Sequence, residues 1–117
     1  MTLSDEHAIT SRELFGKAGE ALVQDDLLQA SEKGWGAAAH LVKSVAQRRS
    51  WRHDGHRELY RAVNRLAQET GDNQIRLLFA SASALHMNFY ENWMPKEMVE
   101  ESLSQVGDFL RKLEDLG

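Results

Sequence analysis

Residues 26–56 read DLLQASEKGWGAAAHLVKSVAQRRSWRHDGH, and the first two thirds of this segment have the residue spacing of a helix. Apolar or small side chains recur at intervals of three and four, at Leu27, Ala30, Gly34, Leu41 and Val45. This period places them on one helical face. Asp26, with Gln29 three residues later, has the form of a capping box. The pattern therefore predicts a helix that begins at Asp26 and buries one apolar face.

Small residues in this predicted helix indicate close packing. Gly34 and Gly36 flank Trp35, and three alanines follow them. A glycine inside a helix costs about 1 kcal/mol relative to alanine, so two of them suggest that a neighbouring backbone comes close. We expect Trp35 to be a core residue rather than an interface residue.

Length and composition restrict the class of protein. The 117 residues fit one domain, 1–117, and the 42% hydrophobic and 27% charged residues are typical of a soluble globular protein. The absence of cysteine excludes disulfides and thiolate metal sites. No apolar run approaches the ~18 residues of a membrane span, and the polar N-terminus does not resemble a signal peptide. We expect a cytoplasmic protein.

Four further helices are predicted around the first. One begins at Ser4 and ends near Gln24, and the others cover residues 56–70, 73–93 and 96–116. Asp54 and Asp72 are the expected caps of two of them, and Gly71 is the expected left-handed stop between them. Five helices with short connections, little β-branched alternation and a single proline predict an all-α, up-and-down bundle of about five antiparallel helices. The helix over 73–93 has a small or polar flank, formed by Ala80, Ser81, Ala84 and Asn88. This flank is suited to close contact with another helix or with a second copy of the protein, and we expect it to be the dimer contact.

Positive charge is concentrated in one part of the chain. Residues 43–65 hold seven of the 14 lysines and arginines but only two acidic residues, although the whole chain has a formal charge of −4. Such segregation can direct a polyanion to one edge of an otherwise acidic protein. A solvated helix face is the alternative interpretation.

The segment from Arg48 to His56 carries the candidate site. Guanidinium groups bind phosphate bidentately and a tryptophan can stack on a base, which suits single-stranded RNA or a nucleotide. The residues expected to bind are Arg49, Trp51, Arg52, His53 and His56. Arg49 and His56 are also candidate catalytic residues, because an imidazole can move a proton while a guanidinium stabilises a phosphorane. Alternatively, Trp51 packs under the connection and the arginines are only solvated.

A second polar cluster lies in the predicted helix over 73–93. His86 and Tyr90 are one helical turn apart, as are His56 and Tyr60 in the preceding helix. Together with Asn88 they are candidate ligand-binding residues, although a partly buried structural role for His86 is the alternative. His53 and His56 have the spacing of two metal ligands, but no third ligand is fixed by spacing. We therefore expect neither a metal nor a cofactor.

Three motifs resemble a known family. Residues 30–46, ASEKGWGAAAHLVKSVA, resemble a helix of HEPN domains, and His56-Arg-Glu-Leu59 is similar to the H-x-x-L that opens the next helix there. Residues 85–91, LHMNFYE, resemble the L-H-x-N-F-Y-E of the PaREP-type archaeal and bacterial relatives. The resemblance implies a four- or five-helix bundle, usually a homodimer. It also implies a role directed at RNA or nucleotides, either as a ribonuclease or as the partner of a small nucleotidyltransferase.

One departure from the HEPN pattern affects the functional expectation. Arg49 and His56 match the arginine–histidine spacing of HEPN ribonucleases, but they lie between the second and third helices rather than on a late helix. The resemblance therefore supports the fold and dimerisation more strongly than the nuclease. We expect an RNA- or nucleotide-binding accessory module that forms a homodimer. The alternatives are a metal-independent ribonuclease that uses Arg49 and His56, and a structural partner of a nucleotidyltransferase-like protein.

Overall fold

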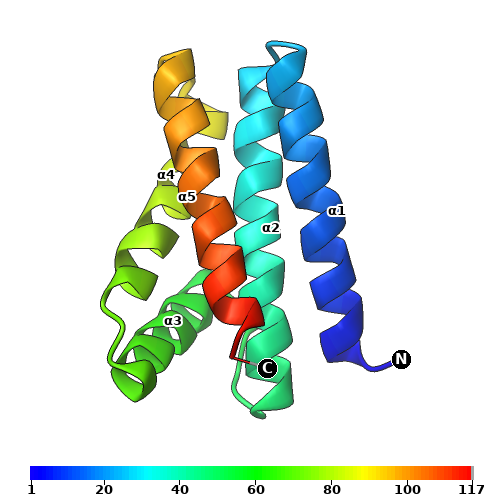
Figure 1. The fold of residues 1–117 in the computed structure, drawn as a ribbon, viewed down its shortest axis with the longest axis vertical. Helices are drawn as coiled ribbons and strands as arrows, with labels where there is room; N and C mark the ends of the chain where they lie inside the picture. Colours follow the sequence, from blue (N-terminus) through cyan, green and yellow to red (C-terminus); the bar gives the residue numbers. More distant parts are fainter. Residues whose placement is uncertain (117) are drawn as a thin grey trace.

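The computed structural model describes residues 1–116, which form five helices and no strand (Figure 1). The helices are α1 (Leu3–Val23), α2 (Leu27–Arg48), α3 (His56–Thr70), α4 (Gln74–Glu91) and α5 (Lys96–Glu114). The predicted all-α bundle is confirmed. Most predicted boundaries lie within two or three residues of these, which is the usual uncertainty at helix ends.

α1 and α2 form an antiparallel hairpin at one side of the bundle (Figure 1). The turn between them contains Asp25 at φ 60°, and the carboxylate of Asp26 accepts a hydrogen bond from the Gln29 amide at 3.2 Å. Because the facing residues are small, the two backbones lie close enough for side-chain-to-backbone bonds. Ser11 Oγ, for example, donates to the Ala37 carbonyl at 2.7 Å.

α2 is the central helix, with twelve buried residues and neighbours on several sides. Gly34 lies against α4 and α5: a Cβ there would be 2.5 Å from Leu103 Cδ2 and 3.1 Å from Leu85 Cδ1. Trp35 is 7% exposed and packs on Phe79 of α4. The expected core tryptophan is therefore confirmed. The packing at the glycines is close as expected, but the neighbours are leucine side chains rather than a backbone.

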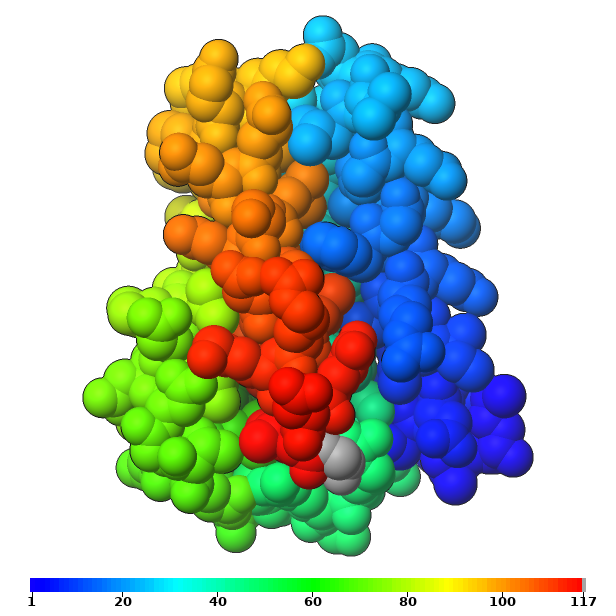
Figure 2. Space-filling view, viewed as in Figure 1, coloured from blue at the N-terminus to red at the C-terminus, as the bar shows by residue number. Residues whose placement is uncertain are grey.

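The other helices close the core around α2. α3 lies tilted across one end of the bundle and buries Leu59, Val63 and Leu66, and it ends at Gly71, whose φ of 70° confirms the left-handed stop (Figure 1). α4 and α5 pack through large side chains such as Phe79 and Phe109. On the face shown in Figure 2, α5 and α1 lie next to each other.

Three predicted caps are wrong: Ser4, where the first helix is predicted to begin, Asp54 and Asp72 are not the N-caps of their helices. The N-cap of α4 is Asn73, although the Asp72 carboxylate accepts a bond from the Gln74 amide at 3.0 Å. The N-cap of α1 is Thr2, which forms a capping box with Asp5, whereas Ser4 lies within the helix and is buried against Ser44. The N-cap of α3 is Gly55, because Asp54 turns toward the guanidinium of Arg52. The competing partner of Ser4 is 40 residues away in the chain, whereas that of Asp54 is the local Arg52, two residues before it.

None of the five helices is long and apolar enough to cross a membrane.

Candidate functional site

Residues 49–55, which connect α2 to α3, separate two hollows. The first, named here the Trp51 groove, has a volume of about 300 Å³ and is lined by Ser50, Trp51, Arg52, Glu58, Arg61, Ala62 and Arg65. The second, named here the Lys43 pocket, has a volume of about 390 Å³ and is lined by Trp35, Ala39, Lys43, Asp54, Gly55, His56 and Leu59. The basic segment predicted from the sequence therefore contributes to both, but its residues are divided between them.

Trp51 is the centre of the Trp51 groove. The Arg65 guanidinium lies 4.4 Å from the centroid of its ring and that of Arg49 lies 5.3 Å away, both within the range of cation–π attraction. The Trp51 amide donates to the Ala46 carbonyl at 2.9 Å, and the side chain packs partly against the core. The indole is thus held in place, and it is half-buried rather than fully covered.

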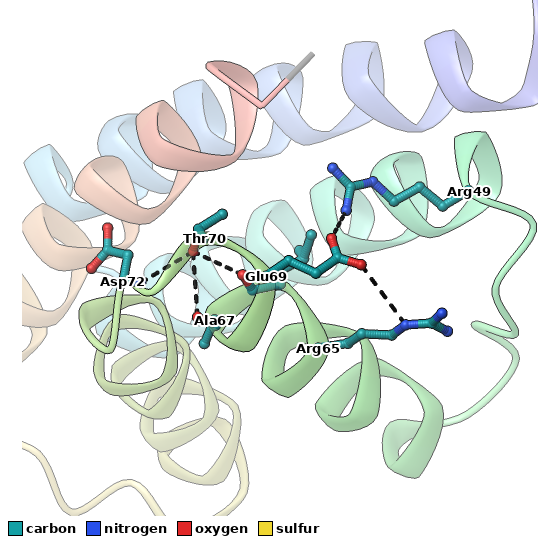
Figure 3. Close-up of polar contacts among 7 residues, drawn as sticks. Arg49, Arg65, Ala67, Glu69, Thr70 and Asp72 are labelled. Atoms are coloured by element: carbon teal, nitrogen blue, oxygen red, sulfur yellow. Dashed lines mark hydrogen bonds and ion pairs between the residues drawn. The ribbon is translucent and has the colours of Figure 1, made fainter.

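Carboxylates reduce the charge of this groove. Glu69 lies between Arg49 and Arg65 and pairs with both, as Figure 3 shows. Arg52 pairs with Asp54 at 3.3 Å and with Glu58 at 3.8 Å. The charge count along residues 43–65 missed Glu69, because that residue lies one helical turn beyond the segment. Exposed ion pairs contribute only about 0–1 kcal/mol, so an incoming phosphate can replace them.

Arg61 differs from its neighbours. It lines the Trp51 groove, it is exposed, and within residues 1–116 it has no carboxylate at ion-pair distance. It is therefore the guanidinium of this groove that is most available to an anion.

The two candidate catalytic residues are not brought together. Arg49 pairs with Glu69 near the C-terminal end of α3, whereas His56 is the first residue of that helix. Along the helix axis, Glu69 and His56 are about 20 Å apart at 1.5 Å per residue. The geometry therefore does not favour a shared reaction centre for Arg49 and His56.

His56 does meet His86, in a cluster at the junction of α2, α3 and α4. The centroids of the two imidazole rings are 5.3 Å apart, and His86 stacks on Trp35 at 4.9 Å. His86 Nδ1 lies 2.9 Å from Glu32 Oε1. Sequence reasoning missed the contribution of Glu32, which no motif marks. The Glu32 carboxylate thus fixes the orientation of the His86 ring through Nδ1.

The predicted aromatic residues lie at the edge of this cluster. Tyr90 is 70% exposed and its ring packs edge-on against His86, with centroids 5.3 Å apart. Tyr60 is bonded through its hydroxyl to Ser83 and packs edge-on against Phe79. Tyr90 thus contacts the cluster directly, whereas Tyr60 contacts Phe79 and Ser83 instead, and neither tyrosine lines the two hollows described above.

Asn88 is not a surface residue. It is fully buried, and its amide group links the end of α4 to α2. Its burial agrees with the predicted close contact of this flank with another helix, and it leaves the side chain no surface for a second copy of the chain. At this position the flank of α4 faces the core, and the Asn88 amide takes part in a buried hydrogen-bond network.

The remaining histidines form a second group that sequence reasoning also missed. His7 Nδ1 and His40 Nδ1 lie 3.0 Å apart, and the centroid of the His53 ring lies 6.0 Å from that of His7. His53 therefore belongs to the group formed with His7 of α1 and His40 of α2, and not to the cluster of His56 and His86. In residues 1–116, no group of three or more histidine or acidic side chains is arranged to hold a metal ion.

Burial lowers the pKa of His7 and of His40, and the nearby Lys43 ammonium lowers both further. An unfolded chain therefore binds protons more readily than the folded one as the pH falls through the ordinary histidine value of about 6.5. Folding stability from this pair is present above that pH and is lost below it.

We expect the midpoint of thermal unfolding to fall between pH 7.5 and pH 5, because the unfolded chain takes up protons at these histidines before the folded chain does. The variant His7→Gln/His40→Gln should show a flatter dependence, because glutamine does not titrate. Thermal unfolding followed by circular dichroism at several pH values measures this. Equal slopes for the two proteins would show that the pair does not contribute.

Comparisons with known proteins support the fold. The model of the archaeal PaREP1/PaREP8 family matches residues 6–110. The crystal structure of a protein from Sulfolobus solfataricus superposes with a TM-score of 0.80 at 22% identity, and the match covers 91% of this chain and 94% of that one. No curated protein matches the chain.

Proposed function

The chain belongs to the archaeal PaREP1/PaREP8 family, and we propose that it is a non-enzymatic, HEPN-like module that binds single-stranded RNA through the Trp51 groove. The observation that carries the proposal is the position of Arg61, an unpaired guanidinium, within residues 1–116, beside a fixed, half-buried indole. This combination offers a phosphate contact and an aromatic surface within one hollow.

The ion pairs around the groove limit how strongly it can bind RNA. Arg52 and Arg65 each have a carboxylate partner, so a phosphate must compete for them. Outside this corner, the negative charge of the protein, which has a formal net charge of −4, repels a polyanion. We therefore expect modest affinity that comes from few phosphate contacts and falls with salt in proportion to their small number.

Replacing Arg61 by alanine should weaken binding of a short labelled single-stranded RNA by about tenfold, as expected for loss of one charge-assisted contact. The slope of log affinity against log salt should fall by about 0.7, the value for one phosphate on a single strand. Fluorescence anisotropy at several salt concentrations measures both. Arg12→Ala on α1 is the matched control, because that arginine is exposed and distant from the groove.

Binding that is absent at low salt, or that Arg61→Ala leaves unchanged, would remove the proposal. A structural partner of another protein, such as a nucleotidyltransferase-like chain, would then be the better account.

We propose further that the module is a homodimer through an exposed stripe on α4. Leu77 is 67% exposed and Met87 is 53% exposed, and Ala80 and Ala84 lie between them at helical spacing. Of the flank predicted from sequence, Ser81 turns toward Gln105 of α5, so only its alanines remain on this stripe.

Light scattering should give the wild type twice the mass of one chain, and Leu77→Glu should convert it to the monomer, because a buried charge opposes an apolar interface. Val23→Glu is the control, since Val23 is 87% exposed on α1. A wild type that is monomeric at high concentration would contradict the proposed dimer.

A further inference from the structure

Lys43 occupies an unusual position on α2. It is half-buried, it lines the Lys43 pocket, and no carboxylate of residues 1–116 lies at ion-pair distance from it. The one acidic residue in the lining, Asp54, is engaged by Arg52 at 3.3 Å. A half-buried ammonium without a partner is costly, so an external anion would stabilise it.

All five histidines of the chain lie in the two groups around this pocket. His7, His40 and His53 form the group at the junction of α1, α2 and the connection, and Lys43 acts electrostatically on His7 and His40. His56 lines the pocket itself and contacts His86. The surroundings of Lys43 are therefore rich in groups that become cationic on protonation.

The charges around His7, His40 and His53 also favour the binding of an anion near Lys43. The pKa values of His7 and His40 are lowered by burial and then by Lys43, and the carboxylate that opposes this is Glu6, which acts weakly on His7. Other charged neighbours on the connection are His53 and Asp54. The protein thus leaves positive potential uncompensated here, in contrast to the Trp51 groove, where Glu58 and Glu69 neutralise arginines.

We propose that the Lys43 pocket binds the phosphate group of a small phosphate monoester, with Lys43 as the principal contact and the histidines gaining protons on binding. A monoester carries close to two negative charges near neutral pH, because its second pKa is about 6, and it has three acceptor oxygens. A volume of about 390 Å³ is within the range of small-molecule sites. Ala39 and Leu59 supply an apolar wall for the rest of the ligand.

This site is separate from the proposed RNA contact, because the two hollows share no lining residue and this one uses neither Trp51 nor Arg61. Failure of one proposal therefore leaves the other standing. The monoester is favoured over a diester because the surrounding groups titrate: a dianion draws protons onto imidazoles more strongly than a monoanion does.

The test is a titration with phenyl phosphate, inorganic phosphate and dimethyl phosphate, followed by NMR of the histidine rings in the full chain. The two species with a titrating phosphate should bind saturably and raise the pKa of His7 and His40 by about half to one unit, through the added negative charge. Dimethyl phosphate, a diester, should bind at least about tenfold more weakly.

Lys43→Met should reduce phenyl phosphate affinity by about tenfold or more, since it removes the one permanent cation of the pocket. Lys33→Met is the matched control: Lys33 is on the same helix but bonds Gln29 at 2.9 Å, outside the pocket. Thermal unfolding of Lys43→Met confirms that the variant is folded. Absence of saturable binding, equal binding of dimethyl phosphate, or an unchanged affinity in Lys43→Met would each overturn the proposal.

Discussion

Replacing Asn88 by leucine is expected to lower the free energy of unfolding by about 3–5 kcal/mol, the range for breaking a buried hydrogen-bond network. Asn88 Oδ1 accepts bonds from the amides of Trp93 at 2.9 Å and Met94 at 2.8 Å. Its Nδ2 donates to Ser31 Oγ at 2.9 Å. Leucine has a similar size but no polar atom, so two partly buried amides would lose their partner.

The position of Asn88 amplifies the effect. α4 ends at Asn92, which has φ 53°, and the chain then turns toward Pro95 and α5. The Asn88 side chain fixes this turn and anchors it to α2 through Ser31. Loss of the amide should therefore loosen the α4–α5 connection as well as weaken the core.

Two variants separate these contributions. Ser31→Ala removes two bonds, the one that Ser31 Oγ accepts from Asn88 Nδ2 and the one that it donates to the Leu27 carbonyl at 2.7 Å, and should cost about 1–2 kcal/mol. Asn88→Asp keeps an acceptor for the two amides but buries a charge and removes the donor, so it should also destabilise the protein. Urea unfolding measures all three. If Asn88→Leu cost no more than Ser31→Ala, the structural role assigned to this amide would be wrong.

The second large effect is expected at Gly34, where valine should cost about 2–4 kcal/mol. A Cβ at this position would lie 2.5 Å from Leu103 Cδ2 and 3.1 Å from Leu85 Cδ1, and both leucines are buried. Overpacking of this kind typically costs about 1–3 kcal/mol, and a branched side chain adds further atoms to the same space.

Two glycines of α1 provide a control in which the expected change in the free energy of unfolding has the opposite sign. A Cβ added to Gly16 or Gly19 would meet no atom within 4 Å, and both residues lie inside the helix. Alanine at either should stabilise the protein by about 0.5–1 kcal/mol through helix propensity. Urea unfolding of Gly34→Val beside these two variants measures the packing effect alone. A stable Gly34→Val would show that α2 is not packed closely against α4 and α5.

Local signals in the sequence predict the helices well. The Asp26 cap, the Gly71 stop and the close approach at Gly34 each depend on residues within a few positions or on one backbone preference. The cap of α3 was missed because Arg52 competes for Asp54, and sequence spacing does not reveal such a competition.

The site was predictable only in part. Residues 48–56 are a basic and aromatic run that is visible in the sequence, and they mark the part of the molecule where the two hollows lie. The partners that decide its chemistry come from elsewhere: Glu69 from the end of α3, Glu32 from the start of α2, and His7 from α1. A bundle brings such residues together through its tertiary packing, which residue spacing within one helix does not encode.

The most direct test of the proposed function uses the three tryptophan indoles as reporters in an NMR titration with single-stranded RNA. Trp35 is almost fully buried, and Trp93 lies beyond α4, away from the groove. RNA binding at the Trp51 groove predicts that the indole N–H signal of Trp51 shifts saturably while those of Trp35 and Trp93 stay in place. An unshifted Trp51 signal at RNA concentrations that saturate binding would contradict the account.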